Sequence, residues 1–267
     1  MATVVREVAE RVFALRYGFF DQTVGLVVGD GICLIVDTRT TYAQARELQD
    51  DVRRITPHPW TVLNTHHHFD HTFGNALFRP SEIWGHRRCI EVLHERGDAM
   101  RDDVARRMPD LAAELEEIEI VPPTRAIDAL VAIDVGGRRV DVAHLGRAHT
   151  DNDVVATVAD GGVLFAGDLV EEGAPPSFGD SFPLDWPAAD DRLLDLAGGP
   201  IVPGHGEVVD VAFVRAQRAE LAEAARLARE AWADGAPVDV AGGRLPFPHA
   251  TAMEHAERAY AQLEGRP

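Results

Sequence analysis

The stretch VLNTHHHFDHTFGN, residues 62–75, concentrates the most chemically active side chains of this 267-residue chain. Four histidines and one aspartate fall within six positions. Imidazole and carboxylate are common ligands of first-row metals, and two imidazoles with a carboxylate suit zinc best. In an extended segment, side chains two residues apart point the same way, so His66 and His68 can bind one ion. Asp70 and His71 follow after a turn and can reach a second ion, so the pattern predicts two adjacent metals.

A histidine run can also be an expression tag or a solvated loop. This run is internal, follows the apolar residues 61–63, and is interrupted by Phe69 and Asp70. These features favour metal binding over the two simpler interpretations.

Composition excludes several function classes. The 267 residues, 46% of them hydrophobic, suit one large α/β domain over 1–267 with a sizeable core. The net charge is -18, which argues against a nucleic-acid partner. The sequence contains no lysine, so Schiff-base chemistry and a lysine nucleophile are excluded.

The cysteines and the termini indicate the compartment. Cys33 lies in the apolar run 32–36, Cys89 is far from it in sequence, and neither belongs to a CxxC motif, so no disulfide framework is expected. The N-terminus lacks a basic segment followed by an apolar one, and no apolar run approaches the ~18 residues of a membrane span. We therefore expect a cytoplasmic protein with no membrane partner.

Hydrophobic patterning predicts alternating strands and helices. Strands are expected at residues 4–16 with a turn near Glu10, and at 23–28, 32–36, 60–63, 81–84, 131–135, 138–145, 154–158, 163–166 and 201–203. Helices are expected from Thr40 or Thr41 to about Ile55, over 86–119 with breaks near Gly97 and Pro109, and at 190–196, 210–233 and 250–263. This order predicts a pair of mixed sheets flanked by helices, with loops at 173–187 and 234–248. In the long helix, an apolar stripe is expected to face the core, formed by Val214, Leu221, Ala225, Ala228 and Trp232.

Three more metal-ligand candidates each follow a predicted strand. They are His149, Asp168 and His205, and each has glycine or another small residue nearby. Small neighbours allow a close approach of backbone to a metal. Any one of the three is weak alone, since a lone histidine is more often structural and an aspartate often belongs to a turn. It is their joint occurrence with residues 66–71 that indicates a two-metal site.

Together these motifs resemble the metallo-β-lactamase-fold hydrolase superfamily over nearly the whole chain. The resemblance implies an α+β fold, a four-layer αβ/βα sandwich with the site at one edge. It implies that the first zinc is held by His66, His68 and His149, and the second by Asp70, His71 and His205, with Asp168 bridging both. Asp37 matches the aspartate that supports the histidine loop. His67 is not a ligand in that pattern.

The sequence differs from several branches of this superfamily, and these differences narrow the choice of branch and of metal. Asp168 stands where the main zinc β-lactamases carry cysteine, and His68 where di-iron flavoproteins of this fold carry glutamate. Two zinc ions per chain are thus favoured, with manganese or iron as alternatives. The absence of lysine argues against the glutathione-binding glyoxalase II branch, and the short acidic chain against the nuclease branch. The segments NTHHHFDHTFGNALF (64–78) and AHTDNDVVA (148–156) are similar to actinorhodin-type polyketide cyclase/thioesterases.

The resemblance implies a zinc-dependent hydrolase of a small acyl substrate, in which a metal-bridging hydroxide attacks a thioester, lactone or related ester or amide carbonyl. His66, His68 and Asp70 are the expected catalytic residues, and Asp70 could pass a proton to the leaving atom. None of the serines lies in a G-x-S-x-G motif. The alternatives are a polyketide cyclase/thioesterase using the same metals and a metal-binding scaffold without catalysis.

The segment EEGAPPSFGDSFPLDW, residues 171–186, follows Asp168 directly. Its aromatic residues Phe178, Phe182 and Trp186 could contact an apolar acyl group. They could equally attach a long loop to the protein body. The sequence leaves both interpretations open.

Overall fold

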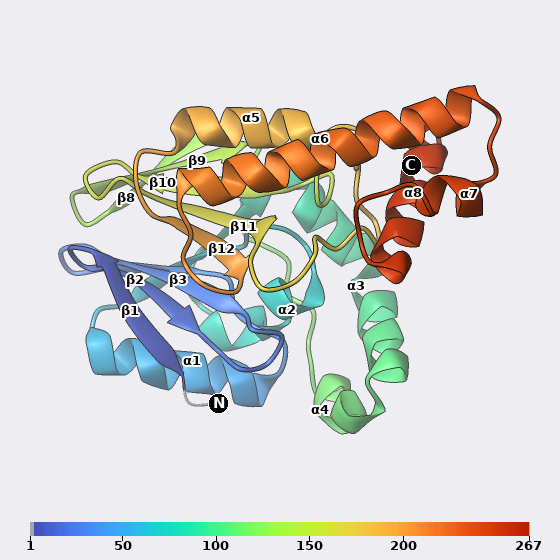
Figure 1. The fold of residues 1–267 in the computed structure, drawn as a ribbon. Coiled ribbons are helices and arrows are strands. Elements are labelled where there is room, and N and C mark those ends of the chain that lie inside the picture. Colours follow the sequence, from blue (N-terminus) through green and yellow to red (C-terminus); the bar gives the residue numbers. More distant parts are fainter. Residues whose placement is uncertain (1–2, 267) are drawn as a thin grey trace.

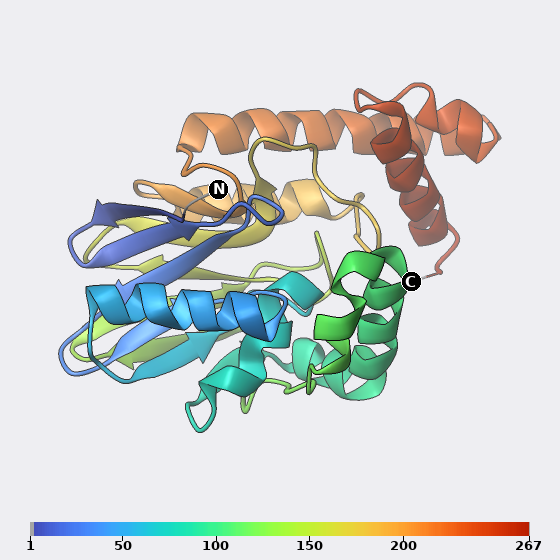
Figure 2. The same cartoon turned by 90° about the horizontal axis from the view of Figure 1, so that it is seen from below.

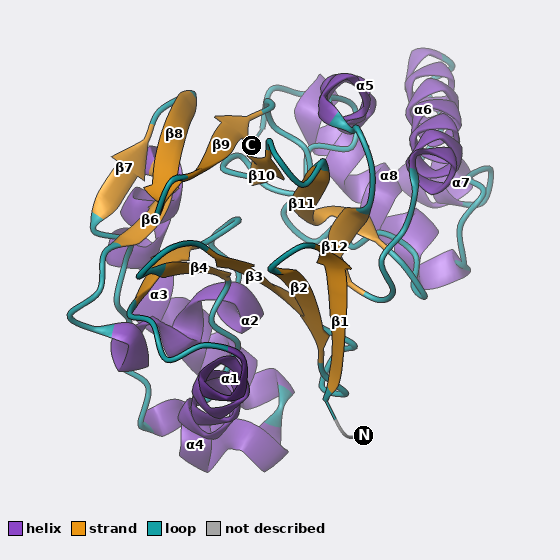
Figure 3. Cartoon of the chain, turned by 90° about the vertical axis from the view of Figure 1, so that its left-hand side faces the viewer, coloured by secondary structure: helices purple, strands orange, loops and turns teal. Residues whose placement is uncertain are grey.

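In the computed structural model, which describes residues 3–266, two β-sheets pack face to face between two layers of helices (Figure 1). Figure 3 shows the strands edge-on, with α1, α3 and α4 on one side and α5 and α6 on the other. This arrangement confirms the predicted four-layer αβ/βα sandwich.

Within the described residues, the first sheet has seven strands and its spatial order follows the sequence. The strands are β1 (Val4–Ala9), β2 (Val12–Arg16), β3 (Thr23–Val28), β4 (Cys33–Val36), β5 (Trp60–Leu63), β6 (Ile83–His86) and β7 (Arg125–Ile127). The first four are antiparallel, whereas β4 to β7 are parallel. Parallel neighbours end at the same edge of a sheet, so the residues after β4 and β5 lie side by side there.

The second sheet, again among the residues described, has five strands in the order β12-β11-β10-β9-β8. They are β8 (Leu130–Val135), β9 (Arg138–His144), β10 (Val154–Val158), β11 (Val163–Glu171) and β12 (Ile201–His205). Only β11 and β12 are parallel in this sheet, so their C-terminal ends lie at the same edge. Gly167 of β11 lies against Thr65, the second residue after β5, so the end of β5 meets this edge.

The helices cover the outer faces of the sheets and one end of the sandwich. They are α1 (Tyr42–Ile55), α2 (Phe69–Thr72), α3 (Arg87–Arg107), α4 (Ala112–Glu116), α5 (Trp186–Leu196), α6 (Val211–Ala233), α7 (Val238–Gly242) and α8 (His249–Leu263), with 3-10 turns η1 (Phe73–Phe78) and η2 (Pro109–Leu111). Figure 1 shows α1 and α6 on opposite sides of the sheets, and Figure 2 shows α3 and α8 at the same end of the molecule. Thr41 caps α1 by accepting a hydrogen bond from the backbone of Gln44, as its sequence predicts.

The core has three layers, because successive strand residues point to opposite faces. In β4, Leu34 and Val36 pack between the two sheets, whereas Cys33 and Ile35 pack against α1. Both faces of the strand are buried, which explains its continuous apolar run. Full burial of each such aliphatic side chain stabilises the fold by about 1.5–3 kcal/mol.

Several local predictions were wrong. Helix α3 continues through Gly97, because Ile120 packs where a side chain at this position would lie. Strand β11 extends to Glu171, so Asp168 lies inside it rather than after it. The short β7 and α7 were not predicted. Trp232, assigned to the buried stripe of α6, is 36% exposed.

Among residues 3–266, no helix has the length and apolar character that crossing a bilayer requires.

Candidate metal centre

The histidine loop is held in place by Asp37, the residue that follows β4. Its two carboxylate oxygens accept hydrogen bonds of 2.8 Å from the backbone and the hydroxyl of Thr65, the second residue after β5. Asp37 itself has a φ of 74°, a conformation that is costly for a residue other than glycine. The strained backbone at Asp37 therefore positions a carboxylate against the start of the histidine loop.

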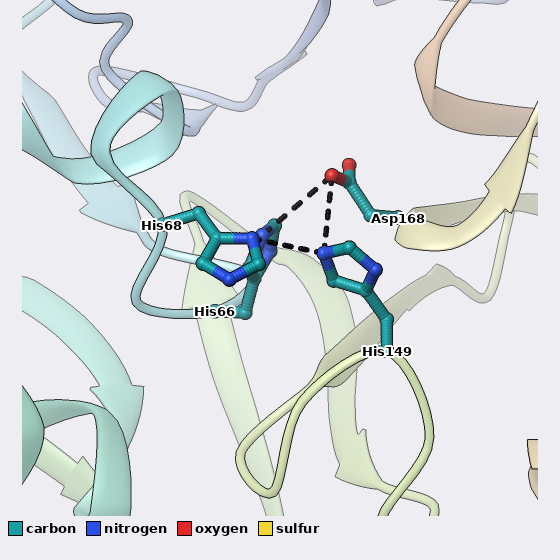
Figure 4. A group of neighbouring side chains, drawn as sticks. All are labelled: His66, His68, His149 and Asp168. Atoms are coloured by element: carbon teal, nitrogen blue, oxygen red, sulfur yellow. Dashed lines mark hydrogen bonds and ion pairs between the residues drawn. The ribbon is translucent and has the colours of Figure 1, made fainter. Parts of the chain in front are cut away.

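Four side chains form a first group, shown in Figure 4: His66, His68, His149 and Asp168. One ligand atom from each lies within 4.8 Å of the others. Nδ1 of His68 is 2.9 Å from Nε2 of His149, and Oδ2 of Asp168 is 3.4 Å from the same Nε2. Oδ2 of Asp168 is 3.6 Å from Nε2 of His66. Three imidazoles and a carboxylate thus converge on one point.

A second group lies alongside and consists of Asp70, His71 and His205. The Nε2 atoms of the two histidines are 3.4 Å apart, and Oδ2 of Asp70 is 3.3 Å from His205. Asp168 reaches this group too, with Oδ1 3.3 Å from His71 and Oδ2 3.3 Å from His205. Its carboxylate therefore lies between the two groups.

In three of these histidines the other ring nitrogen faces a fixed partner, whereas Nδ1 of His149 has no hydrogen-bond partner within the described residues. Nδ1 of His71 is 2.8 Å from Oδ2 of Asp37, and Nδ1 of His205 is 2.9 Å from the carbonyl of Phe20. Nδ1 of His66 lies 3.0 Å from the Thr65 hydroxyl. Such partners fix the tautomer and the orientation of the ring, and here each leaves Nε2 directed at the centre.

The electrostatics of the two groups are tightly linked. Burial, with His71 nearby, lowers the pKa of His66 well below its usual value. Burial also opposes a charge on His71 and His205, but the facing Asp168 carboxylate outweighs it and raises the pKa of both imidazoles well above the usual value. The cluster therefore attracts positive charge, as a cation site must.

The donor set fits a metal. Within the described part of the chain, Nε2 of His66 and Oδ1 of Asp168 are buried without a hydrogen-bond partner, a costly state that metal coordination would relieve. Asp168 is also backed closely by Gly204, where any Cβ would overlap its carboxylate. Five histidines and two aspartates are the ligand types that first-row divalent ions prefer.

The centre opens into a cavity of about 320 Å³. Phe20 and Phe69 provide apolar walls, Asp21 and Glu172 provide carboxylates, and Glu171 provides a third carboxyl group. Glu171 is almost fully buried, and its burial, together with the nearby Asp168, raises its pKa to about 8. The cavity therefore offers an apolar surface beside an acidic rim.

The aromatic residues of the 171–186 segment do not line this cavity. Phe178 and Trp186 are fully buried and Phe182 is 6% exposed. The Phe178 ring contacts Trp186 edge-on, and the Trp186 indole donates to the carbonyl of Leu169. This packing favours the interpretation that they attach the loop to the body. Gly173, Ala174 and Ser177 of the same loop line the cavity instead.

Sequence reasoning missed Asp180, which lies against His67 and His68. It also assigned His67 no role, although this side chain is buried. Asp180 is 112 positions from His68 along the chain, and no local pattern links the two. The one available signal for the Asp180–His68 contact is that residues 177–180 follow the end of β11 closely in sequence.

The layered αβ/βα sandwich with a histidine–aspartate centre at one edge defines the class of metallohydrolase folds. The chain belongs to the metallo-beta-lactamase superfamily, which matches over residues 17–205. Members of this superfamily are generally hydrolases. No curated protein sequence matches the chain.

Several solved structures with the same fold are metallo-beta-lactamases. The structure of TMB-1 has a TM-score of 0.67 at 18% identity and covers 85% of this chain and 99% of its own. The structure of DIM-1 metallo-beta-lactamase exposed to ceftazidime has a TM-score of 0.66 at 19% identity, covering 84% and 97%. A metallo-beta-lactamase from Pontibacter korlensis has a TM-score of 0.66 at 18% identity, covering 82% and 98%. At these identities the likeness shows the fold alone.

Proposed function

We propose that the chain is a dinuclear zinc hydrolase that cleaves a small acyl compound at its carbonyl carbon, a thioester or lactone first among the candidates. The observation that carries the proposal is the position of the Asp168 carboxylate, within 3.6 Å of four imidazoles from both groups. The first zinc would be held by His66, His68 and His149, the second by Asp70, His71 and His205, and Asp168 would contact both. Bound zinc would supply Lewis acidity and lower the pKa of water toward neutrality.

The chain's own residues position the reactants. Water adds to the carbonyl carbon, the acyl bond breaks, and the departing sulfur or oxygen needs a proton. Oδ2 of Asp70 is 3.3 Å from His205 and borders the cavity, so it is placed to take the proton from water and deliver it to the leaving atom. Phe20 and Phe69 would receive an apolar acyl group. The carboxylates at the rim disfavour an anionic substrate.

A cyclase/thioesterase is the second candidate. A cavity of about 380 Å³ shares His68 and Phe69 with the central one, and another of about 600 Å³ shares Glu171 and Gly173 with it. Together they give an extended surface beside the metal centre, which suits a long, folded acyl chain. The similarity of residues 64–78 and 148–156 to polyketide cyclases points the same way.

The test is a turnover panel on zinc-loaded protein with thioesters, lactones and β-lactams, each repeated after chelation and after zinc is restored. We expect thioester or lactone turnover that disappears with the chelator and returns with zinc. Asp70→Asn should lower turnover strongly. Ring-closed product from a poly-β-ketone thioester would favour the cyclase. Metal binding without turnover of any substrate would contradict the hydrolase proposal and favour a scaffold.

A further inference from the structure

We propose that Asp180 is a positioning residue that fixes the His68 ring so that Nδ1 faces the metal group. Oδ1 of Asp180 is 2.9 Å from Nε2 of His68, and on the opposite side of the ring Nδ1 is 2.9 Å from Nε2 of His149. A carboxylate only accepts, so it selects the tautomer with the proton on Nε2 and leaves the Nδ1 lone pair free for a metal. The inference rests on the proposed metal binding.

His67 gives Asp180 a second attachment. Oδ2 of Asp180 is 3.2 Å from Nε2 of His67, so its two oxygens face two successive histidines. The other ring nitrogen of His67 is 2.8 Å from the side-chain nitrogen of Asn152, which fixes that ring in turn. His67 is only 6% exposed. Its role in this arrangement is to hold the carboxylate that orients its neighbour.

The loop that carries Asp180 is anchored by the C-terminal helix. Arg258 of α8 donates from Nε to the carbonyl of Ser181 at 2.9 Å, and from Nη2 to the carbonyl of Asp180 at 3.2 Å. The Phe178 ring packs against His255 of the same helix, 4.8 Å between centroids. The Asp180 side chain is 49% exposed, so without these anchors water would compete for it. Helix α8 thus sets the geometry of a metal ligand that it does not touch.

His68 differs from the other candidate ligands in this respect. The partners of His66, His71 and His205 lie in segments that follow strands β5, β4 and β2 of the first sheet, respectively. The partner of His68 comes from the 172–185 loop, outside both sheets. Asp180 also borders the cavity of about 380 Å³, so its side chain can be shortened without disturbing the core.

The test compares Asp180→Ala and Asp180→Asn with the wild type. Zinc affinity is measured by competition with a chromophoric chelator. The His68 tautomer is measured by ¹⁵N NMR of the metal-free protein above pH 9, where the ring is neutral, because the effect of burial is outweighed by Asp180, which raises the pKa of this imidazole to about 9. We expect Asp180→Ala to lower the affinity for one of the two zinc ions about 10–100-fold. It should also remove the preference of His68 for the tautomer that carries its proton on Nε2. Asp180→Asn retains an acceptor oxygen and should lose less.

Asp185→Asn is the matched control, because Asp185 lies on the same loop but pairs with Arg147 at 2.7 Å rather than with a candidate metal ligand. It should change zinc affinity by less than about twofold. Arg258→Ala, which frees the loop, should shift the His68 tautomer in the same direction as Asp180→Ala. An unchanged tautomer in Asp180→Ala would overturn the inference. A wild type that binds no zinc would overturn the proposed function, while the tautomer would still decide the role of Asp180.

Discussion

Two fully buried histidines of this molecule, His66 and His255, have opposite surroundings. His66 lies in the metal centre, with its Nε2 directed at the carboxylate of Asp168. His255 of α8 lies between the rings of Phe178 and Phe247, and within residues 3–266 neither of its ring nitrogens has a hydrogen-bond partner. Burial lowers the pKa of both, that of His255 to about 4. Burial alone therefore gives a neutral histidine, and converging carboxylates are what make a cation site.

His71 completes the comparison. It is as buried as His255, yet its pKa lies well above the usual value because Asp168, Asp70 and Asp37 face it. The difference is set by partners that the fold brings from three separate segments. Buried imidazoles are thus sorted into ligands and packing groups by their neighbours.

The largest effect expected from this comparison is the loss of metal in His66→Ala. His255→Ala removes an equally buried ring that packs on Phe178 of the loop carrying Asp180, so it should lose far less zinc than His66→Ala. Because the metal contributes several kcal/mol of transition-state stabilisation, turnover in His66→Ala should fall roughly a thousandfold, or by about 4 kcal/mol. Metal content by atomic emission and turnover on the best substrate measure both variants.

His255→Ala serves as the control for the loss of a buried side chain, since it should lower the melting temperature while turnover per folded molecule falls far less than in His66→Ala. Equal zinc loss in the two variants would show that the centre responds to general destabilisation, and the comparison would then fail.

The next effect is a pH dependence of stability that belongs to His255. Its pKa in the folded state is lowered to about 4, compared with 6.5 for an ordinary histidine in the unfolded chain. The unfolded chain therefore takes up the proton first as pH falls. The contribution is therefore fully present above pH ~6.5 and is lost between about pH 6.5 and 4, by about 3 kcal/mol at most.

The measurement is denaturant unfolding of wild type and His255→Phe across this range. Taking the difference between the two proteins cancels the titration of the metal centre, which both share. The stability of the wild type relative to His255→Phe should fall as pH drops. A difference that stays constant between pH 7 and 4.5 would contradict the assignment of a neutral, unpartnered imidazole.

Local sequence rules account for most of the fold and for the candidate ligands of the centre. The motif at 66–71 is contiguous, and His149 and His205 follow predicted strands whose edge the topology fixes. What escaped prediction depends on contacts distant in sequence. Gly97 continues its helix because Ile120 packs on it, and Asp180 meets His68 only through the folded loop. His255 carries no local signal, because its role is set by two phenylalanines from other segments.

The smallest of the three effects concerns Asp37, one of the three carboxylates that face His71 and the one that contacts its Nδ1. Asp37→Asn keeps the size of the side chain but replaces one acceptor oxygen by an amino group. That group cannot accept the Nδ1 proton of His71, so the ring would favour the other tautomer and turn a proton toward the metal. We expect zinc affinity to fall about 10–100-fold, which corresponds to about 1.4–2.7 kcal/mol.

Asp51→Asn is the matched control. Asp51 is also a mostly buried aspartate, and it accepts from the Tyr17 hydroxyl at 3.2 Å on the α1 side of the same sheet, where no candidate ligand lies among residues 3–266. It can destabilise the fold without affecting zinc binding. If both variants lost zinc equally, Asp37 would affect zinc binding only through the general stability of the fold. If Asp37→Asn alone did, the orientation of one imidazole by one carboxylate would be what separates a metal ligand from a packed histidine.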